Sequence, residues 1–72
     1  MLPERCHEHD KKWIDEQLKK LPPFALRRAI EGYDKVFSES YDNEPIEYKK
    51  ENKARRDANT RLREYVEKII TI

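Results

Sequence analysis

The sequence predicts an all-α protein, in which a shorter N-terminal helix packs on an antiparallel helical hairpin to form a three-helix bundle. Apolar residues recur at the three- and four-residue spacing of helices through most of the chain. Only two stretches, LPP at 21–23 and DNEP at 42–45, combine clear helix-breaking residues. The chain has 72 residues and no internal repeat, so residues 1–72 are expected to form a single small helical domain.

The composition is rich in charge and poor in apolar residues. Charged residues make up 43% and hydrophobic residues 36%, while the formal net charge is only +1. Like charges therefore do not force the chain apart, and the helical spacing favours a folded bundle over disorder. A chain this short buries only about 60% of its unfolded surface. A homodimer would bury apolar surface that the monomer leaves exposed.

The first helix is expected over about His9–Leu21, after a flexible tail at 1–8. Pro22 and Pro23 disfavour helix in the residues before them. Pro23 can open the next helix, because its missing N–H would have no intrahelical partner there. The apolar face of the first helix consists of Trp13, Ile14, Leu18 and Leu21.

The second helix is expected over about Pro23–Tyr41. Gly32 lies within it and costs about 1 kcal/mol relative to alanine in a helix interior. Either close helix packing beside Tyr33 or a hinge would account for this glycine. The seam that should pack on another helix comprises Leu26, Ile30, Tyr33 and Phe37, and Phe24, Ala29 and Val36 widen it.

The third helix is expected over about Pro45–Ile70. The short DNEP turn before it makes the second and third helices antiparallel neighbours. Three exposed pairs at i and i+4 should support the helix, namely Glu51–Arg55, Asp57–Arg61 and Glu64–Lys68. Its apolar stripe comprises Ala54, Ala58, Leu62, Tyr65, Val66 and Ile69.

The third helix also presents a line of cations opposite its apolar stripe. At 3.6 residues per turn, these side chains lie within about 40° of one line. We call them the basic strip; they are Lys49, Lys53, Arg56 and Arg63. Such a strip could contact phosphates of a nucleic acid or an acidic protein partner.

A solvated helix face is the competing interpretation of the basic strip. Glu67 lies on the same line and Asp57 and Glu64 lie beside it, and mixed charge is typical of a face in water. No base-reading pattern of Asn or Gln accompanies the cations. A second basic pair, Arg27 and Arg28, begins the second helix, where Arg27 can pair with Glu31 or both can be ordinary surface.

The N-terminal stretch CHEH contains residue types that bind zinc. Cys6, His7 and His9 match no standard zinc-finger spacing, and residues two apart on a helix point away from each other. A Cys–His nucleophile would also need a third, orienting group, which the sequence does not supply. We therefore expect no metal, no cofactor and no enzymatic activity.

Targeting signals and membrane spans are not expected. No apolar run approaches the roughly 20 residues that a bilayer span needs, and MLPERCHEHDKK has no apolar signal region. The single cysteine allows no internal disulfide, which fits a reducing compartment. These observations favour a soluble cytoplasmic protein.

Two segments of the chain carry a family resemblance. LPPFALRRAIEGYDKVF at 21–37 and RRDANTRLREYVEKI at 55–69 resemble a helical N-terminal segment of replication-initiator nickases of temperate tailed phages. This chain and the nickases share a Leu-Pro before an Arg-containing helix. An Arg-rich helix with Ala-Asn and Leu-Arg-Glu at its centre then follows in each. The matching positions are Leu21, Pro22, Arg27, Tyr33, Arg56, Ala58, Asn59, Leu62, Arg63 and Glu64.

The resemblance implies a phage or prophage context, but it implies no catalysis. Those nickases share a His-hydrophobic-His metal motif on a strand and a downstream catalytic tyrosine. HEH at 7–9 has a charged centre, no strand is predicted around it, and it stands in the wrong order along the chain. The resemblance suggests a helical accessory module near DNA replication. Such a module would bind a DNA-processing protein or, as the alternative, bind nucleic acid directly and without sequence preference.

Overall fold

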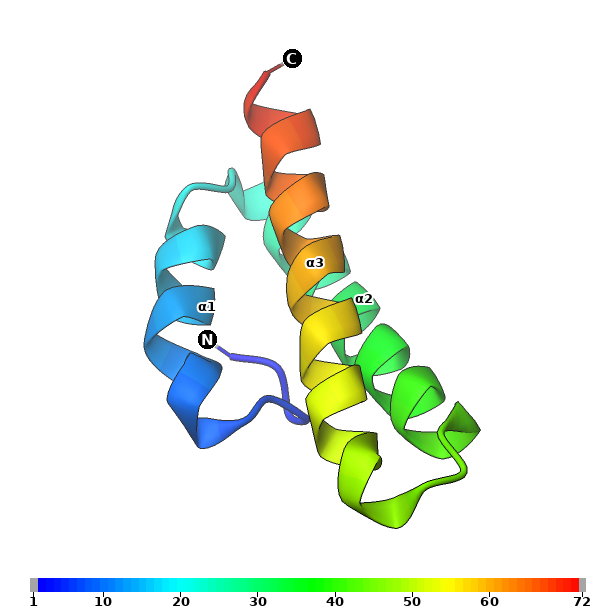
Figure 1. The fold of residues 1–72 in the computed structure, drawn as a ribbon. Helices are drawn as coiled ribbons and strands as arrows, with labels where there is room; N and C mark the ends of the chain where they lie inside the picture. The colour runs from blue at the N-terminus through cyan, green and yellow to red at the C-terminus, as the bar shows by residue number, and fades with distance from the viewer. Residues whose placement is uncertain (1, 72) are drawn as a thin grey trace.

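The computed structural model describes residues 2–71, and these residues form three α-helices. Helix α1 spans Lys11–Lys19, α2 spans Pro23–Asn43 and α3 spans Lys50–Ile70. Short 3₁₀ turns, η1 at Glu8–Asp10 and η2 at Glu47–Lys49, precede α1 and α3. Helices α2 and α3 form an antiparallel hairpin, and α1 lies along one side of it (Figure 1). No strand occurs in the described part of the chain, and the predicted three-helix architecture is confirmed.

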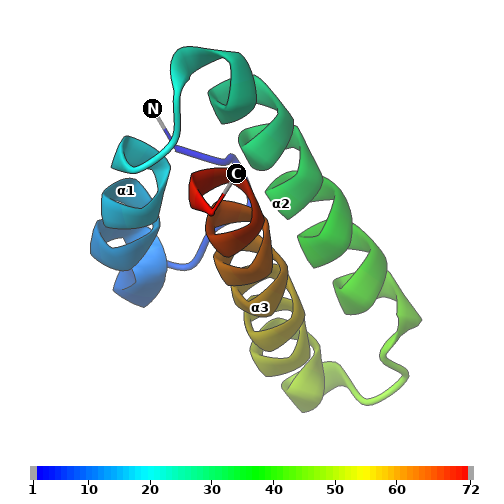
Figure 2. The same cartoon turned by 90° about the horizontal axis from the view of Figure 1, so that it is seen from above.

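The elements are arranged as one layer of two long helices and a thinner covering layer. Seen from above, α1 and the N-terminal segment lie on the same side of the α2–α3 hairpin (Figure 2). The opposite side of the hairpin is not covered by any described segment. The structure therefore has one covered and one open hairpin face. None of its described helices is long and apolar enough to cross a membrane.

Helix α1 packs through one apolar edge. Ile14 and Leu18 are buried, together with Leu21 beyond the helix end, while Trp13 is half-buried. The helix ends at Lys19, earlier than the predicted Leu21. The ring of Pro22 disfavours helical backbone at the residue before it, so Leu21 packs its side chain outside the helix.

Helix α2 begins at Pro23, as predicted, and buries positions four residues apart. Its buried apolar residues are Ala25, Ala29, Tyr33 and Phe37. Leu26 and Ile30, which the sequence suggested as part of the seam, are half-buried beside this line. The prediction that Phe24 widens the apolar stripe is wrong, because Phe24 is 80% exposed. Ala25 occupies the position that faces the core, and the residue before it is turned about 100° away.

Helix α3 begins at Lys50, five residues after the predicted Pro45. Glu44 has the extended backbone typical of a residue before proline, with φ −84° and ψ 116°. Ile46 is also extended, so helical backbone starts only with the turn η2. From there α3 buries every fourth residue, and its core positions are Ala54, Ala58, Leu62 and Val66.

The two long helices approach closely because large residues on one face small residues on the other. Since α2 and α3 are antiparallel, Tyr33 and Phe37 belong to the part of the hairpin that contains Ala54 and Ala58, as the Tyr33–Asn59 and Ser40–Asp57 hydrogen bonds show. Ala25 and Ala29 belong to the other end, with Leu62 and Val66. This alternation lets large side chains pack against small ones in a chain that has few large apolar residues.

The turn between the long helices is held by one lysine. The Nζ of Lys50 donates hydrogen bonds to the carbonyl oxygens of Tyr41, at 3.2 Å, and Glu44, at 2.6 Å. A cation at these carbonyls also complements the negative end of the α2 dipole. Lys50 thus joins the end of α2 to the start of α3.

The N-terminal segment lies against α2. The backbone N–H groups of Glu4 and Arg5 donate to the two carboxylate oxygens of Asp34, at 3.2 and 2.9 Å. The guanidinium of Arg5 lies 5.6 and 5.5 Å from the ring centroids of Phe37 and Tyr41. Residues 2–8 of the predicted flexible tail belong to this segment, and residue 1 lies outside the described residues. The flexibility of the tail stays a prediction.

Candidate interaction site

A polar network at the covered face joins η1, α2 and α3. Asp10 accepts two hydrogen bonds from Arg55 of α3, from Nε at 2.9 Å and from Nη2 at 3.2 Å. On the same side of α3, Asn59 accepts a hydrogen bond of 2.5 Å from the hydroxyl of Tyr33, which belongs to α2. Every buried side-chain polar atom in residues 2–71 has a hydrogen-bond partner. The network therefore carries no unpaired donor or acceptor that would mark a ligand site.

The protonation states in this network follow from its geometry. The hydrogen bonds from Arg55 lower the pKa of Asp10 below its ordinary value, although burial opposes that shift. Burial is the main cause that raises the pKa of Tyr33, so its phenol stays neutral and donates to Asn59. A charged carboxylate and a neutral phenol are the forms that stabilise the bundle here.

The basic strip is only partly available to a partner. Lys49, the last residue of η2, is exposed, and so are Arg56 and Arg63 on α3. Lys53 is half-buried and turns toward α2, where its Nζ lies 3.6 Å from Asp57 and 3.4 Å from the hydroxyl of Ser40. Arg56 also approaches Asp57, at 3.6 Å, but its side chain stays 73% exposed. Three cations of the strip therefore face outward, and Lys53 is engaged within the hairpin.

The structure brings one end of the basic strip together around a shallow hollow of about 490 Å³ at the α2–α3 turn. Glu44 and Asn52 line this hollow beside Lys49, Lys53 and Arg56. The carboxylate of Glu44 reduces the positive charge there. Arg63 does not line the hollow, since it lies two turns further along α3. The four predicted cations thus do not form one continuous site.

The second predicted basic pair is divided between two roles. Arg27 donates from Nε to Glu31 at 2.9 Å, which confirms the pairing expected from their spacing. Arg28 is exposed and lines a different hollow, on the open face of the hairpin. The two arginines therefore do not line one hollow.

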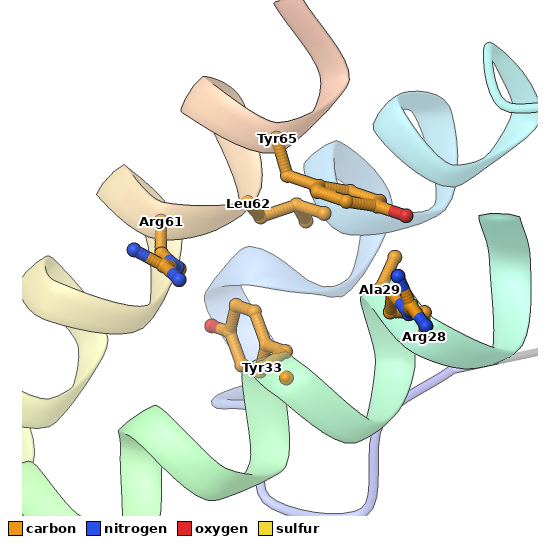
Figure 3. Close-up of a pocket in the computed structure, with 7 residues that line it drawn as sticks. Arg28, Ala29, Tyr33, Arg61, Leu62 and Tyr65 are labelled. Carbon is orange, nitrogen blue, oxygen red and sulfur yellow. The ribbon is translucent and has the colours of Figure 1, made fainter. Parts of the chain in front are cut away.

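The hollow on the open hairpin face was not predicted from the sequence. It has a volume of about 150 Å³. Figure 3 shows Arg28 on α2 and Arg61 on α3 on either side of it, with Leu62 and Tyr65 between them. We call it the α2–α3 groove; its lining residues are Arg28, Ala29, Gly32, Tyr33, Arg61, Leu62 and Tyr65.

Gly32 opens this groove. The predicted close packing beside Tyr33 is wrong, because a Cβ built on Gly32 would meet no heavy atom within 4 Å. Tyr33 points its ring toward α3, where its hydroxyl reaches Asn59, and leaves the space beside Gly32 free. The single glycine of the chain was visible in the sequence, but its surroundings depend on tertiary packing.

The predicted ion pairs along α3 are replaced by contacts with other elements. Arg55 binds Asp10, and Glu51 lies 3.0 Å from the Nε2 of His7, so these two do not pair with each other. Asp57 accepts a hydrogen bond of 2.5 Å from Ser40 and does not pair with Arg61. Glu64 and Lys68 form no ion pair within residues 2–71. Arg61 lies beside the groove and forms no ion pair within residues 2–71.

The residues at the N-terminus that could bind metal have structural contacts instead. The Nδ1 of His7 accepts from the N–H of His9 at 3.0 Å and caps η1, and the two imidazoles stack at 4.9 Å. The thiol of Cys6 donates to the carbonyl of Pro3 at 3.3 Å, and burial raises its pKa. Within the described chain, no three His, Cys, Asp or Glu residues form a group that could hold a metal ion.

Comparisons with known proteins identify no relative. No family model matches the chain, and neither the search of curated proteins nor the search of solved structures finds a match.

Proposed function

We propose that this chain is a small non-enzymatic accessory module, which binds a DNA-processing or replication protein through its charged helical surface. The observation that supports this proposal is the combination of exposed cations on α3 with an uncovered hairpin face. Arg56 and Arg63 point outward on α3, and Arg61 lies at the edge of the open face. Arginine is enriched in protein interfaces, where its planar guanidinium binds carboxylates.

The non-enzymatic part of the proposal is supported by the state of the most reactive side chain. Burial raises the pKa of Cys6, which favours the unreactive thiol over the nucleophilic thiolate. Its thiol donates to a backbone carbonyl, and the Nδ1 of His7 is occupied by the N–H of His9. The other ring nitrogen of His7, Nε2, lies 3.0 Å from Glu51, so both nitrogens of His7 have partners other than the cysteine.

The phage or prophage setting is proposed from the resemblance of residues 21–37 and 55–69 to replication-initiator nickases. Several of the matching positions, including Tyr33, Ala58 and Leu62, are core residues of the hairpin. Arg56 and Arg63 are the exposed matching cations on α3. These two arginines are accordingly the residues to test for partner binding in a bacterial host.

Affinity capture from an extract of bacterial cells carrying the prophage tests the proposal. The protein should retain a replication or DNA-processing protein, identified by mass spectrometry, after nuclease treatment of the extract. Arg56→Glu combined with Arg63→Glu should lose that protein. Lys12→Glu combined with Lys35→Glu is the matched control, because both lysines are exposed and pair with no described residue. Retention by the first variant, or capture of no such protein, would contradict the proposal.

Direct nucleic-acid binding is the second candidate, and the three outward cations of the basic strip favour it. Each phosphate contact should contribute a slope of about −0.9 to the logarithmic salt dependence of affinity for duplex DNA. Binding of a generic duplex, measured by anisotropy over a salt series, should therefore weaken steeply, and Arg56→Glu with Arg63→Glu should remove it. Undetectable binding at low salt rejects this candidate. Light scattering at high concentration tests the proposed homodimer in the same samples.

A further inference from the structure

We propose that the α2–α3 groove receives an apolar side chain from an acidic helical segment of the partner, whose carboxylates bind Arg28 and Arg61. The partner helix would lie on the open face of the hairpin, opposite α1. This inference rests on the proposed function and names the chemistry of the partner.

The floor of the groove is apolar and shaped by small residues. On α2, Ala29 and Gly32 leave space that larger side chains would fill, and on α3 Leu62 and Tyr65 form the opposite wall (Figure 3). The volume of about 150 Å³ lies below the roughly 300 to 1,000 Å³ of small-molecule sites. It suits a single large apolar side chain, which is how a partner anchors itself at the centre of an interface.

The rim of the groove favours a partner with negatively charged side chains. Arg28 and Arg61 are exposed on opposite sides of the apolar floor, and neither belongs to any ion pair of residues 2–71. Arg61 also lines a second hollow of about 150 Å³, which continues along α3 with Glu64, Tyr65 and Lys68. The free cations along this path outnumber the single carboxylate, so a segment with acidic residues is complementary.

The form of the groove suits a helix. The groove lies between two long antiparallel helices. The second hollow is lined by α3 residues alone, shares Arg61 and Tyr65 with the groove and extends toward Lys68. A helix laid along such a path presents apolar side chains at i, i+3, i+4 and i+7. Bound there, it would complete a four-helix arrangement, with α1 on one side of the hairpin and the partner on the other.

The charges of the groove disfavour the other occupants. A second copy facing the groove with its own groove would place arginines against arginines, and like charges cost free energy in an interface. A nucleic acid would satisfy the arginines but would leave the apolar floor without a matching group. An acidic amphipathic helix satisfies both parts of the surface.

Designed peptides test the chemistry directly. The probe is a fluorescein-labelled amphipathic helix of roughly 20 residues, long enough to form helix in water, with leucine at the spacing above and glutamate on both flanks. One comparison peptide carries lysine in place of glutamate, and another carries alanine in place of leucine. The acidic peptide should bind, and it should shift the backbone amide resonances of Gly32 and Leu62. Both comparison peptides should bind at least tenfold more weakly, as expected when a 1.4 kcal/mol contribution is lost.

Two substitutions of Gly32 in the groove form a matched pair of variants. Gly32→Leu places a side chain in the open space and should abolish peptide binding, whereas Gly32→Ala should retain it. Arg28→Glu with Arg61→Glu should weaken the acidic peptide at least tenfold and favour the lysine peptide. Lys12→Glu with Lys35→Glu, which changes two exposed lysines outside the groove, should leave peptide binding unchanged. The double variants alter exposed residues, so they carry the test even if Gly32→Leu fails to fold by circular dichroism.

Several outcomes would overturn the inference. One is that the acidic peptide does not bind. Another is that folded Gly32→Leu binds the acidic peptide as tightly as the parent protein does. A third is that duplex DNA, and not the peptide, shifts the backbone amide resonances of Gly32 and Leu62. Self-association that Gly32→Leu abolishes would assign the groove to a second copy. Failure of the two proposals can be told apart. If the captured replication protein stays bound to Gly32→Leu but is lost with the Arg56 and Arg63 changes, the proposed function stands and the groove inference fails.

Discussion

Arg55 on α3 holds both carboxylate oxygens of Asp10, a residue 45 positions earlier at the start of α1. The two hydrogen bonds measure 2.9 and 3.2 Å and come from Nε and Nη2 of one guanidinium. The exposed fractions of the two side chains are 28% for Arg55 and 14% for Asp10. This contact is an ion pair between the start of the covering layer and the hairpin.

Loss of this contact should destabilise the protein. We expect Arg55→Ala to lower the free energy of unfolding by about 1 to 3 kcal/mol, because it leaves a partly buried carboxylate without its partner. Urea denaturation measures the change. Arg56→Ala, at an exposed neighbouring position, should stay within about 0.5 kcal/mol of the parent. Equal effects of the two substitutions on the free energy of unfolding would show that the Asp10–Arg55 contact does not stabilise the protein.

Acid should weaken the fold through Asp10 and Asp57. The pKa of each is lowered in the folded protein, for Asp10 mainly by hydrogen bonds from Arg55 and for Asp57 mainly by that from Ser40. Their stabilising contribution is therefore complete above the ordinary value of 3.8 and is lost as the pH falls through the lowered folded pKa. The urea midpoint should fall over that range, and less steeply in Asp10→Asn. An unchanged slope in that variant would exclude Asp10 as a contributor.

Removing the hydroxyl of Tyr33 should expose the role of its bond to Asn59. Tyr33→Phe keeps the ring in the core but leaves the Asn59 oxygen without its donor, which costs about 1 to 2 kcal/mol. Thermal and urea unfolding provide the measurement. Tyr48→Phe serves as the control, because Tyr48 is 79% exposed and its loss of a hydroxyl should be neutral.

Gly32→Ala should raise the free energy of unfolding by about 0.5 to 1 kcal/mol. Alanine is the better helix former, and glycine loses more backbone entropy on folding. No described glycine has positive φ, and the added methyl meets no atom within 4 Å. A loss of stability in Gly32→Ala would show that this position needs the freedom of glycine, as a hinge would.

The helices are predicted well from the sequence, because the residues that a helix buries recur every three or four positions. Ala54, Ala58 and Leu62 were assigned to the core by spacing alone, and all three are buried. The boundaries were less exact, since local backbone effects decide them. Pro45 was placed inside the third helix, whereas its ring holds Glu44 extended and delays the helix to Lys50.

Charged contacts were predicted poorly because the i, i+4 rule considers one helix in isolation. Arg55 and Glu51 have the spacing of a pair, but Asp10 accepts two hydrogen bonds from Arg55 at a less exposed position. Once Asp57 binds Ser40, Arg61 has no described partner and becomes part of the groove. Periodicity predicts an exposed basic strip, and Arg56 and Arg63 are exposed on α3, whereas Lys53 is half-buried because it contacts Ser40 of α2.

The separation between Asp10 and Arg55 also bears on the order in which the molecule assembles. The hairpin closes through a short turn at Glu44 and Pro45, while docking of α1 requires contacts between residues 45 positions apart. Local contacts cost less loop entropy, so the transition state for folding should contain the hairpin before α1 docks. In stopped-flow kinetics, Asp10→Ala should then accelerate unfolding and leave refolding nearly unchanged, whereas Ala58→Gly should slow refolding. The covering helix would thus control how long the folded protein survives, and the hairpin how quickly it forms.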